Sequence, residues 1–294
     1  MTRPTPLKET PVHLATLDDH GLDVPVLVAP DRGVIRISAL AERPVLSLLD
    51  VIEDGSFDDL VAKATKAGDE LFTPVADVRF TAPYRRPRKI WGIGLNYVDH
   101  AADLSESVPE EPASFIKGDH TIIGAGDPIP IPRQSERTTA EGELGLVIGR
   151  ECRDVGEAEA LDYVFGVTTI LDQTAEDILQ RNPRFLTRSK NFPGFFSFGP
   201  QIVPMAEVLD RFGEISEIEV STVVNGDESR TNTVAHMKYS PAFLVAFHSA
   251  VMPLFPGDVI STGTPGAIHI RAGDVAECRI PGIGGLLNPV VAGG

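Results

Sequence analysis

The sequence contains little cysteine, and its two thiols are far apart. Cys152 and Cys278 are the only cysteines among 294 residues, and they form no C-x-x-C pair. Such spacing supports neither a disulfide framework nor a thiolate zinc site. We therefore expect both to be buried, unreactive thiols.

The sequence also lacks long apolar runs. No stretch approaches the roughly 18 consecutive apolar residues of a membrane-spanning helix. The beginning of the chain, MTRPTPLKET, has no apolar core of the kind found in a secretory signal. The expected location is the cytoplasm, and no membrane partner is expected.

Basic residues are scarce relative to acidic ones. There are 26 Lys and Arg against 42 Asp and Glu, which gives a formal net charge of −16. A surface this acidic repels a phosphate backbone, so no nucleic-acid partner is expected. Apolar residues make up 42% of the chain, which permits a folded core and excludes a disordered protein.

Residues 1–85 predict a small α+β domain. Strand patterns occupy 12–16, 25–29 and 33–38, and helical patterns occupy 45–51 and 57–67. Prolines are dense between residues 72 and 88, which is typical of a connection between domains. We place the domain boundary near residue 85.

Residues 86–294 predict a mostly β domain. Short apolar or β-branched runs separated by Gly/Pro turns are typical of a barrel, roll or sandwich. These runs are 90–93, 145–148, 164–171, 218–225, 258–262 and 275–280. Gly92 and Gly94 begin a dinucleotide-binding pattern, but Tyr97 takes the third glycine position, so no nucleotide site is expected.

Three acidic residues are candidates for a metal site. Glu141 and Glu143 are two apart in a strand pattern, so their side chains share one face while Leu144 and Leu146 face a core. Asp172 ends an apolar run, where an unpaired charge is hard to explain. Three hard oxygen ligands favour Mg²⁺ or Mn²⁺, with water or substrate completing an octahedron, and disfavour zinc. Alternatively, the two glutamates form a solvated strand face.

Two further groups of residues are candidates for catalysis. His100 and Asp103 are three apart on an expected helical turn, where the carboxylate raises the basicity of an imidazole that activates water. The alternative is an ordinary exposed pair. Lys117 and Lys190 lie beside aromatic residues, so they either keep solvated ammonium groups or, if buried, bind substrate oxygens. The turn at 261–266 either aims donors at a carboxylate or is a plain hairpin.

Taken in order, these segments resemble the fumarylacetoacetate hydrolase family over about residues 88–291. Each piece is weak alone, but their order and spacing together are specific. The matching pieces are Gly94-Leu95-Asn96-Tyr97 with His100, Phe115-x-Lys117, Gly126-Asp127-Pro128-Ile129, Glu141-x-Glu143-Leu144, Asp172 with Asp177, Lys190, Gly199-Pro200, Val224-Asn225-Gly226, Asn232-Thr233, Pro256-Gly257-Asp258-Val259-Ile260, Thr262-Gly263-Thr264-Pro265 and Asn288-Pro289-Val290.

The resemblance implies a mixed β-roll catalytic domain, usually in a homodimer, behind a small α+β N-terminal domain. It implies Mg²⁺, or alternatively Mn²⁺, held by Glu141, Glu143 and Asp172. The acid beside the catalytic histidine is often a glutamate in this family, so the resemblance leaves open whether Asp103, Glu106 or neither completes the pair with His100. The implied catalytic residues are His100, Asp103 and Lys190, and the implied substrate contacts are Tyr97, Lys117, Gly263 and Thr264.

The activity implied by the resemblance is hydrolysis of a C–C bond in a β-diketo acid, such as an acylpyruvate, fumarylacetoacetate or fumarylpyruvate. The metal stabilises the enolate that leaves, and His100 activates the attacking water. Decarboxylation of oxaloacetate-like 2-oxo acids is an alternative within the family, as is hydratase or isomerase activity. A metal-binding sensor or scaffold without turnover is an alternative of another class.

The chain departs from the family pattern after Asp172. The family commonly has D-x-S-A-R-D-[LI]-Q there, whereas this chain has Glu176 and Leu179 in place of the arginine and the glutamine. We therefore expect a changed substrate pocket. Thr174 and Asp177 are expected to cap the start of a helix. The arginines that follow form either a carboxylate clamp or, as we favour, a solvated helix face; they are Arg181, Arg184 and Arg188.

Overall fold

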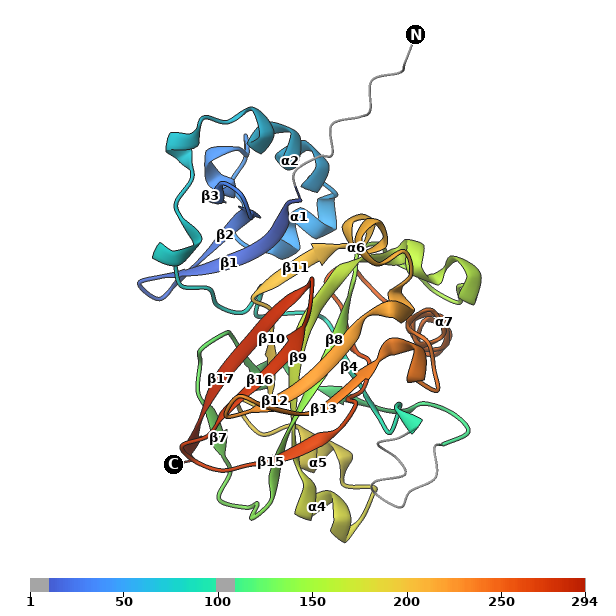
Figure 1. Ribbon diagram of the computed structural model, residues 1–294. Helices are drawn as coiled ribbons and strands as arrows, with labels where there is room; N and C mark the ends of the chain where they lie inside the picture. Colours follow the sequence, from blue (N-terminus) through green and yellow to red (C-terminus); the bar gives the residue numbers. More distant parts are fainter. Residues whose placement is uncertain (1–10, 99–108, 294) are drawn as a thin grey trace.

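Two β-sheets form the frame of the protein (Figure 1). The computed structural model describes residues 11–98 and 109–293. The larger sheet contains, in spatial order, β3 (Gly33–Arg36), β2 (Leu22–Ala29), β1 (His13–Asp19), β11 (Gln201–Pro204), β9 (Val164–Ala175), β8 (Thr138–Ile148), β14 (Val259–Ser261), β4 (Ile90–Gly94) and β5 (Ala113–Lys117). Three short strands extend it: β10 (Phe196–Phe198), β6 (Ile122–Ile123) and β15 (Ala267–Ile270).

The smaller sheet and a few helices complete the fold. The smaller sheet has the order β13 (Asp227–Thr233), β12 (Glu219–Val224), β16 (Val275–Ile280), β17 (Gly284–Ala292) and β7 (Ile129–Ile131). The α-helices of the described residues are α1 (Leu48–Asp54), α2 (Phe57–Lys66), α4 (Glu176–Arg181), α5 (Leu186–Lys190), α6 (Met205–Phe212) and α7 (Pro241–Val251). Within residues 11–98 and 109–293, none of the helices is both long and apolar enough to span a membrane. The predicted mostly β fold class is confirmed.

Strand β8 divides its side chains between two environments. Leu144 and Leu146 pack with Ala276 and Leu286 of the smaller sheet in the main hydrophobic core. Val147, which points to the opposite face, joins a second cluster on the other side of the larger sheet. The alternation predicted from the sequence is therefore confirmed, and it separates the glutamates of β8 from the main core.

The N-terminal strands continue the larger sheet. Strand β1 pairs with β11, with Leu14 opposite Ile202. The second cluster contains residues from both parts of the chain, among them Leu14, Leu27, Val147 and Val259. The connecting segment is also packed, because Tyr84 is buried and donates a hydrogen bond to the carbonyl oxygen of Gly257. The domain boundary near residue 85 stays a prediction.

The two cysteines are free and buried, as expected. Burial raises the pKa of the Cys278 thiol to about 12 and that of Cys152 to about 11. Both thiols therefore stay protonated near neutral pH, which is the unreactive form.

Gly142, between the two glutamates, allows the two sheets to approach closely. Its N–H donates to Thr222 Oγ1 in β12 at 2.8 Å. A Cβ atom at this position would lie 2.7 Å from the carbonyl oxygen of Ser221. That distance is shorter than van der Waals contact, so only glycine fits here without moving a strand.

We expect Gly142→Ala to lower the free energy of unfolding by about 1–3 kcal/mol, because the added methyl group overpacks the contact between β8 and β12. Chemical denaturation measures the change. Gly285→Ala in β17 is the matched control, since its added Cβ would have Glu277 Oε1 as nearest neighbour at 3.5 Å. A Gly142→Ala protein as stable as the wild type would contradict the close approach.

Candidate metal centre

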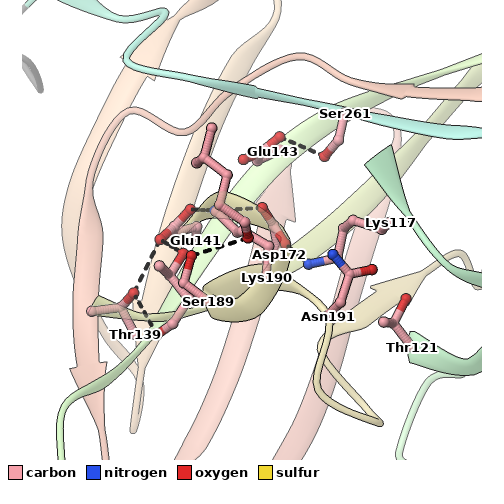
Figure 2. Close-up of polar contacts among 12 residues, drawn as sticks. Lys117, Thr121, Thr139, Glu141, Glu143, Asp172, Ser189, Lys190, Asn191 and Ser261 are labelled. Atoms are coloured by element: carbon pink, nitrogen blue, oxygen red, sulfur yellow. Dashed lines mark hydrogen bonds and ion pairs between the residues drawn. The ribbon is translucent and has the colours of Figure 1, made fainter. Parts of the chain in front are cut away.

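Three carboxylates meet on one buried face of the larger sheet (Figure 2). Glu141 and Glu143 come from β8, and Asp172 comes from β9, where it pairs directly with Glu141. All three residues are buried, and one oxygen of each lies within 4.8 Å of the others. Directly opposite residues of two antiparallel strands point to the same face, which explains the convergence.

Two buried lysines neutralise part of this charge. Lys190 Nζ lies 2.8 Å from Glu141 Oε2 and 2.6 Å from Asp172 Oδ2. Lys117 Nζ donates to the other oxygen of Asp172. The side chain of Lys117 is 0% exposed and that of Lys190 is 6% exposed. The alternative that their ammonium groups are solvated is therefore excluded.

The ionisation of these groups follows from their burial. Burial raises the pKa of Glu143 to about 8, and the negative charge of Asp172 adds to the shift. Burial also lowers the pKa of Lys117. Burial acts on Lys190 in the same direction, but the carboxylates of Asp172 and Glu141 outweigh it and raise its pKa above the ordinary value.

Each glutamate has one oxygen fixed by two donors. Glu143 Oε2 accepts from Ser261 Oγ at 2.5 Å and from the N–H of Gly263 at 2.8 Å. Glu141 Oε1 accepts from Thr174 Oγ1 at 2.5 Å and from Thr139 Oγ1 at 3.0 Å. These donors lie on β8, β9 and β14 and in the turn after β14. Together they fix the orientation of the two carboxylates.

The donor set fits a divalent cation that prefers oxygen. Within residues 11–98 and 109–293, the cluster consists of carboxylates, without histidine or cysteine. Hard oxygen ligands suit magnesium, manganese or calcium better than zinc. The buried negative charge and the raised pKa of Glu143 show that the site gains from a further positive charge.

Asn191 fixes the segments that carry the two lysines, and no pattern in the sequence predicts this role. Its Oδ1 accepts from the N–H of Gly118 at 2.8 Å, and its Nδ2 donates to the carbonyl oxygens of Ile116 and Thr187. The residues on either side of Lys117 are thereby tied to α5, which ends at Lys190. Thr139 is also without a signal in the sequence, whereas Thr174 is predicted as a helix cap. The turn at 261–266 does aim donors at a carboxylate, that of Glu143, through Ser261 and Gly263.

The residues predicted to contact substrate are buried around the carboxylates. Tyr97 is buried, and within the described chain its hydroxyl has no hydrogen-bond partner. Gly263 reaches the site through its hydrogen bond to Glu143. Thr264 is 5% exposed, and its hydroxyl bonds to the backbone of Gly266.

The predicted proton-transfer residues lie outside the described part of the chain. These are His100 and Asp103, together with the alternative acid Glu106. Their assignment stays a prediction.

The predicted helix cap of Thr174 and Asp177 is wrong. Helix α4 begins after Ala175 without a side-chain cap. The Thr174 hydroxyl is directed to Glu141, and Asp177 accepts from Ser135 Oγ at 2.6 Å instead. The spacing is typical of a cap, but β9 continues through Ala175 and turns Thr174 toward the carboxylates.

The two departures from the family pattern lie on α4, next to the site. Glu176 accepts from Arg137 Nε at 2.5 Å and from Gln180 Nε2 at 3.1 Å, so its charge is paired with the arginine that directly precedes β8.

Arg181 is exposed and pairs with Asp177. This favours the interpretation of the arginines as a solvated helix face.

The raised pKa of Glu143 predicts pH-dependent metal binding. Below pH 8 a proton must leave Glu143 before its oxygen can bind a metal, so we expect the affinity for Mn²⁺ to rise about tenfold per pH unit up to about pH 8 and then to level off. Calorimetric titration of metal-stripped protein measures this. Glu143→Gln removes the slope, whereas exposed Glu219→Gln in β12 keeps it. Constant wild-type affinity below pH 8 would refute the assignment.

The chain is similar to known proteins over most of its length. The family model described as fumarylacetoacetate (FAA) hydrolase C-terminal matches residues 89–291. A mitochondrial oxaloacetate tautomerase of Xenopus laevis is 32% identical over 268 residues, covering 88% of this chain and 83% of that protein.

Two solved structures show the same fold. The 5-carboxymethyl-2-hydroxymuconate delta-isomerase of Mycobacterium smegmatis has a TM-score of 0.66 at 38% identity, covering 75% of this chain and 82% of that one. The maleylpyruvate hydrolase of Sphingobium sp. SYK-6, in complex with manganese(II) and pyruvate, has a TM-score of 0.80 at 26% identity, covering 96% and 100%. The chain therefore belongs to the fumarylacetoacetate hydrolase family.

Proposed function

We propose that the protein is a Mg²⁺-dependent hydrolase that cleaves a C–C bond in a β-diketo acid of the acylpyruvate, fumarylacetoacetate or fumarylpyruvate kind. The observation that carries the proposal is the buried group of Glu141, Glu143 and Asp172 with two lysines against it. Mn²⁺ is the alternative ion. When bound, the ion supplies positive charge that stabilises negative charge on substrate oxygens.

The lysines are proposed to bind the substrate. Lys190 and Lys117 place two ammonium groups beside the carboxylates in a buried site, where charge–charge interactions are strong. Lys190 is assigned to the oxygen on which negative charge develops as the C–C bond breaks, and Lys117 to a second substrate oxygen. Tyr97 and Thr264 are assigned to substrate contacts, and Gly263 acts through Glu143.

Water activation is assigned to His100 with Asp103. In hydrolysis the imidazole takes a proton from water, and the resulting hydroxide attacks the carbonyl carbon distal to the carboxylate. The C–C bond then breaks to give a carboxylic acid and an enolate, and the imidazolium returns its proton to the enolate carbon. The new carboxylic acid ionises, so one proton is released overall near neutral pH. Glu106 is the alternative partner of His100.

Tautomerisation or isomerisation of an oxaloacetate-like 2-oxo acid is the second candidate function. The similarity to an oxaloacetate tautomerase over 88% of the chain favours it, as does the similarity to an isomerase. Such a reaction moves a proton next to a carbonyl group and uses the same stabilisation of an enolate, but it needs no attacking water. Decarboxylation of the same acids also needs no water.

The departures Glu176 and Leu179 bear on the substrate. Glu176 pairs with Arg137 instead of offering a positive charge, and Leu179 offers no side-chain hydrogen bond. We therefore propose that the part of the substrate remote from the 2-oxo acid differs from that of family members with the usual residues. A homodimer is also proposed, on the family resemblance, and the cytoplasmic location stays a prediction from the sequence.

The decisive experiment separates the candidate reactions by their products. Metal-stripped and Mg²⁺-loaded protein is incubated with an acylpyruvate, fumarylpyruvate and oxaloacetate, and the products are identified by mass and by enol absorbance. We expect pyruvate and a second acid from a diketo acid with the loaded protein alone. Enol–keto exchange or CO₂ release from oxaloacetate, without diketo-acid cleavage, would replace the hydrolase proposal by the second candidate.

The His100→Ala variant tests the proposed base. We expect it to lower kcat for hydrolysis by about 10²–10⁴-fold, since general-base catalysis contributes about that much. The Kd for Mn²⁺ should stay unchanged, because His100 is not among the proposed ligands. Exposed His20→Ala serves as the control. Retention of wild-type turnover would refute the assignment.

A further inference from the structure

We infer that Thr139 and Thr174 form a hydroxyl clamp that fixes the orientation of the Glu141 carboxylate for metal binding. The two threonines are positioning residues that act through Glu141. The inference rests on the proposed function because it concerns the metal that this function requires.

The clamp is built into the pairing of β8 with β9. Thr139 lies directly opposite Thr174, just as Glu141 lies directly opposite Asp172 two residues further along β8. All four side chains therefore point to the same face of the sheet. Figure 2 shows Thr139 beside Glu141, at the end of the carboxylate group away from Ser261. Both threonines are 3% exposed, so water does not replace their hydrogen bonds.

Both hydroxyl protons are directed to the same carboxylate oxygen. Thr174 Oγ1 donates to Glu141 Oε1 at 2.5 Å, and Thr139 Oγ1 donates to it at 3.0 Å. Each hydroxyl has one proton to donate. Thr139 has another acceptor in reach, the carbonyl oxygen of Thr174, but at the longer distance of 3.5 Å.

The clamp leaves the two oxygens of Glu141 in different environments. Oε1 is held by the hydroxyls, whereas Oε2 faces Lys190 Nζ at 2.8 Å. Turning both oxygens toward one ion would strip the buried hydroxyls of their acceptor, which is unfavourable. Glu143 is held in the same way through Oε2 by Ser261 and Gly263. The protein thus fixes the orientation of both glutamates before a metal arrives, which reduces the ordering that binding requires.

Valine substitutions test the clamp because valine keeps the shape of threonine without its hydroxyl. The Kd for Mn²⁺ is measured by calorimetry on metal-stripped, full-length protein. We expect the Thr139→Val/Thr174→Val double variant to bind about 10–100-fold more weakly, the usual effect of losing groups that orient metal ligands. The Thr139→Ser/Thr174→Ser variant keeps both hydroxyls and should bind like the wild type.

Thr168→Val is the matched control. Thr168 lies on the same strand and face as Thr174 and is fully buried, but its hydroxyl donates to the carbonyl oxygen of Gln201 at 2.7 Å. It should lose some stability and keep the Mn²⁺ affinity. Thermal unfolding of the metal-free variants accounts for any general loss of structure.

A double-mutant cycle separates positioning from general destabilisation. In a Glu141→Ala background the two valine substitutions should no longer change the Kd, because the group that they orient is absent. An unchanged Kd in the folded double valine variant would overturn the clamp, and so would an equal loss in the Glu141→Ala background. Failure of the wild type to bind Mn²⁺ or Mg²⁺ at all would instead overturn the proposed function.

Discussion

The pairing of β8 with β9 is the constraint on which the candidate site depends. Its register sets Glu141 against Asp172 and brings carboxylates from two distant parts of the chain onto one buried face. Buried charge is stable only when it is compensated. The chain brings two lysines to the same place, one from β5 and one from α5, and the chemistry of the oxygen donors suits a divalent ion. Strand register therefore decides both the geometry and the electrostatics of the site.

The same two strands also build the main core, and this makes the site rigid. The side chains of β8 that point away from the carboxylates pack against the smaller sheet, and Gly142 lets that sheet approach within hydrogen-bonding distance. The donors that hold Glu141 and Glu143 lie on β8 itself, on β9 and β14 beside it, and in the turn after β14. A site supported by strands on both sides keeps its ligands oriented better than one carried by loops.

The sequence predicted the parts of the site that local patterns encode. The two-residue spacing of Glu141 and Glu143 placed them on one face, and Asp172 was noticeable because a charge ended an apolar run. Apart from the turn at 261–266, the sequence did not predict the residues that orient these carboxylates, because such contacts depend on which distant strands pair and in what register. Thr174 shows the difficulty, since its spacing from Asp177 also suits a helix cap. The attachment of the N-terminal strands to β11 was missed for the same reason.

That attachment has a consequence for how this architecture is assembled. Strand β1 covers the backbone edge of β11, and residues of β1 and β2 shield apolar side chains of the central strands. Removal of the first 85 residues would leave unpaired N–H and C=O groups beside an uncovered apolar surface, a combination that promotes self-association. The N-terminal segment of this protein thus protects an edge of its larger sheet, and a shortened version of the protein needs another segment to cover that edge.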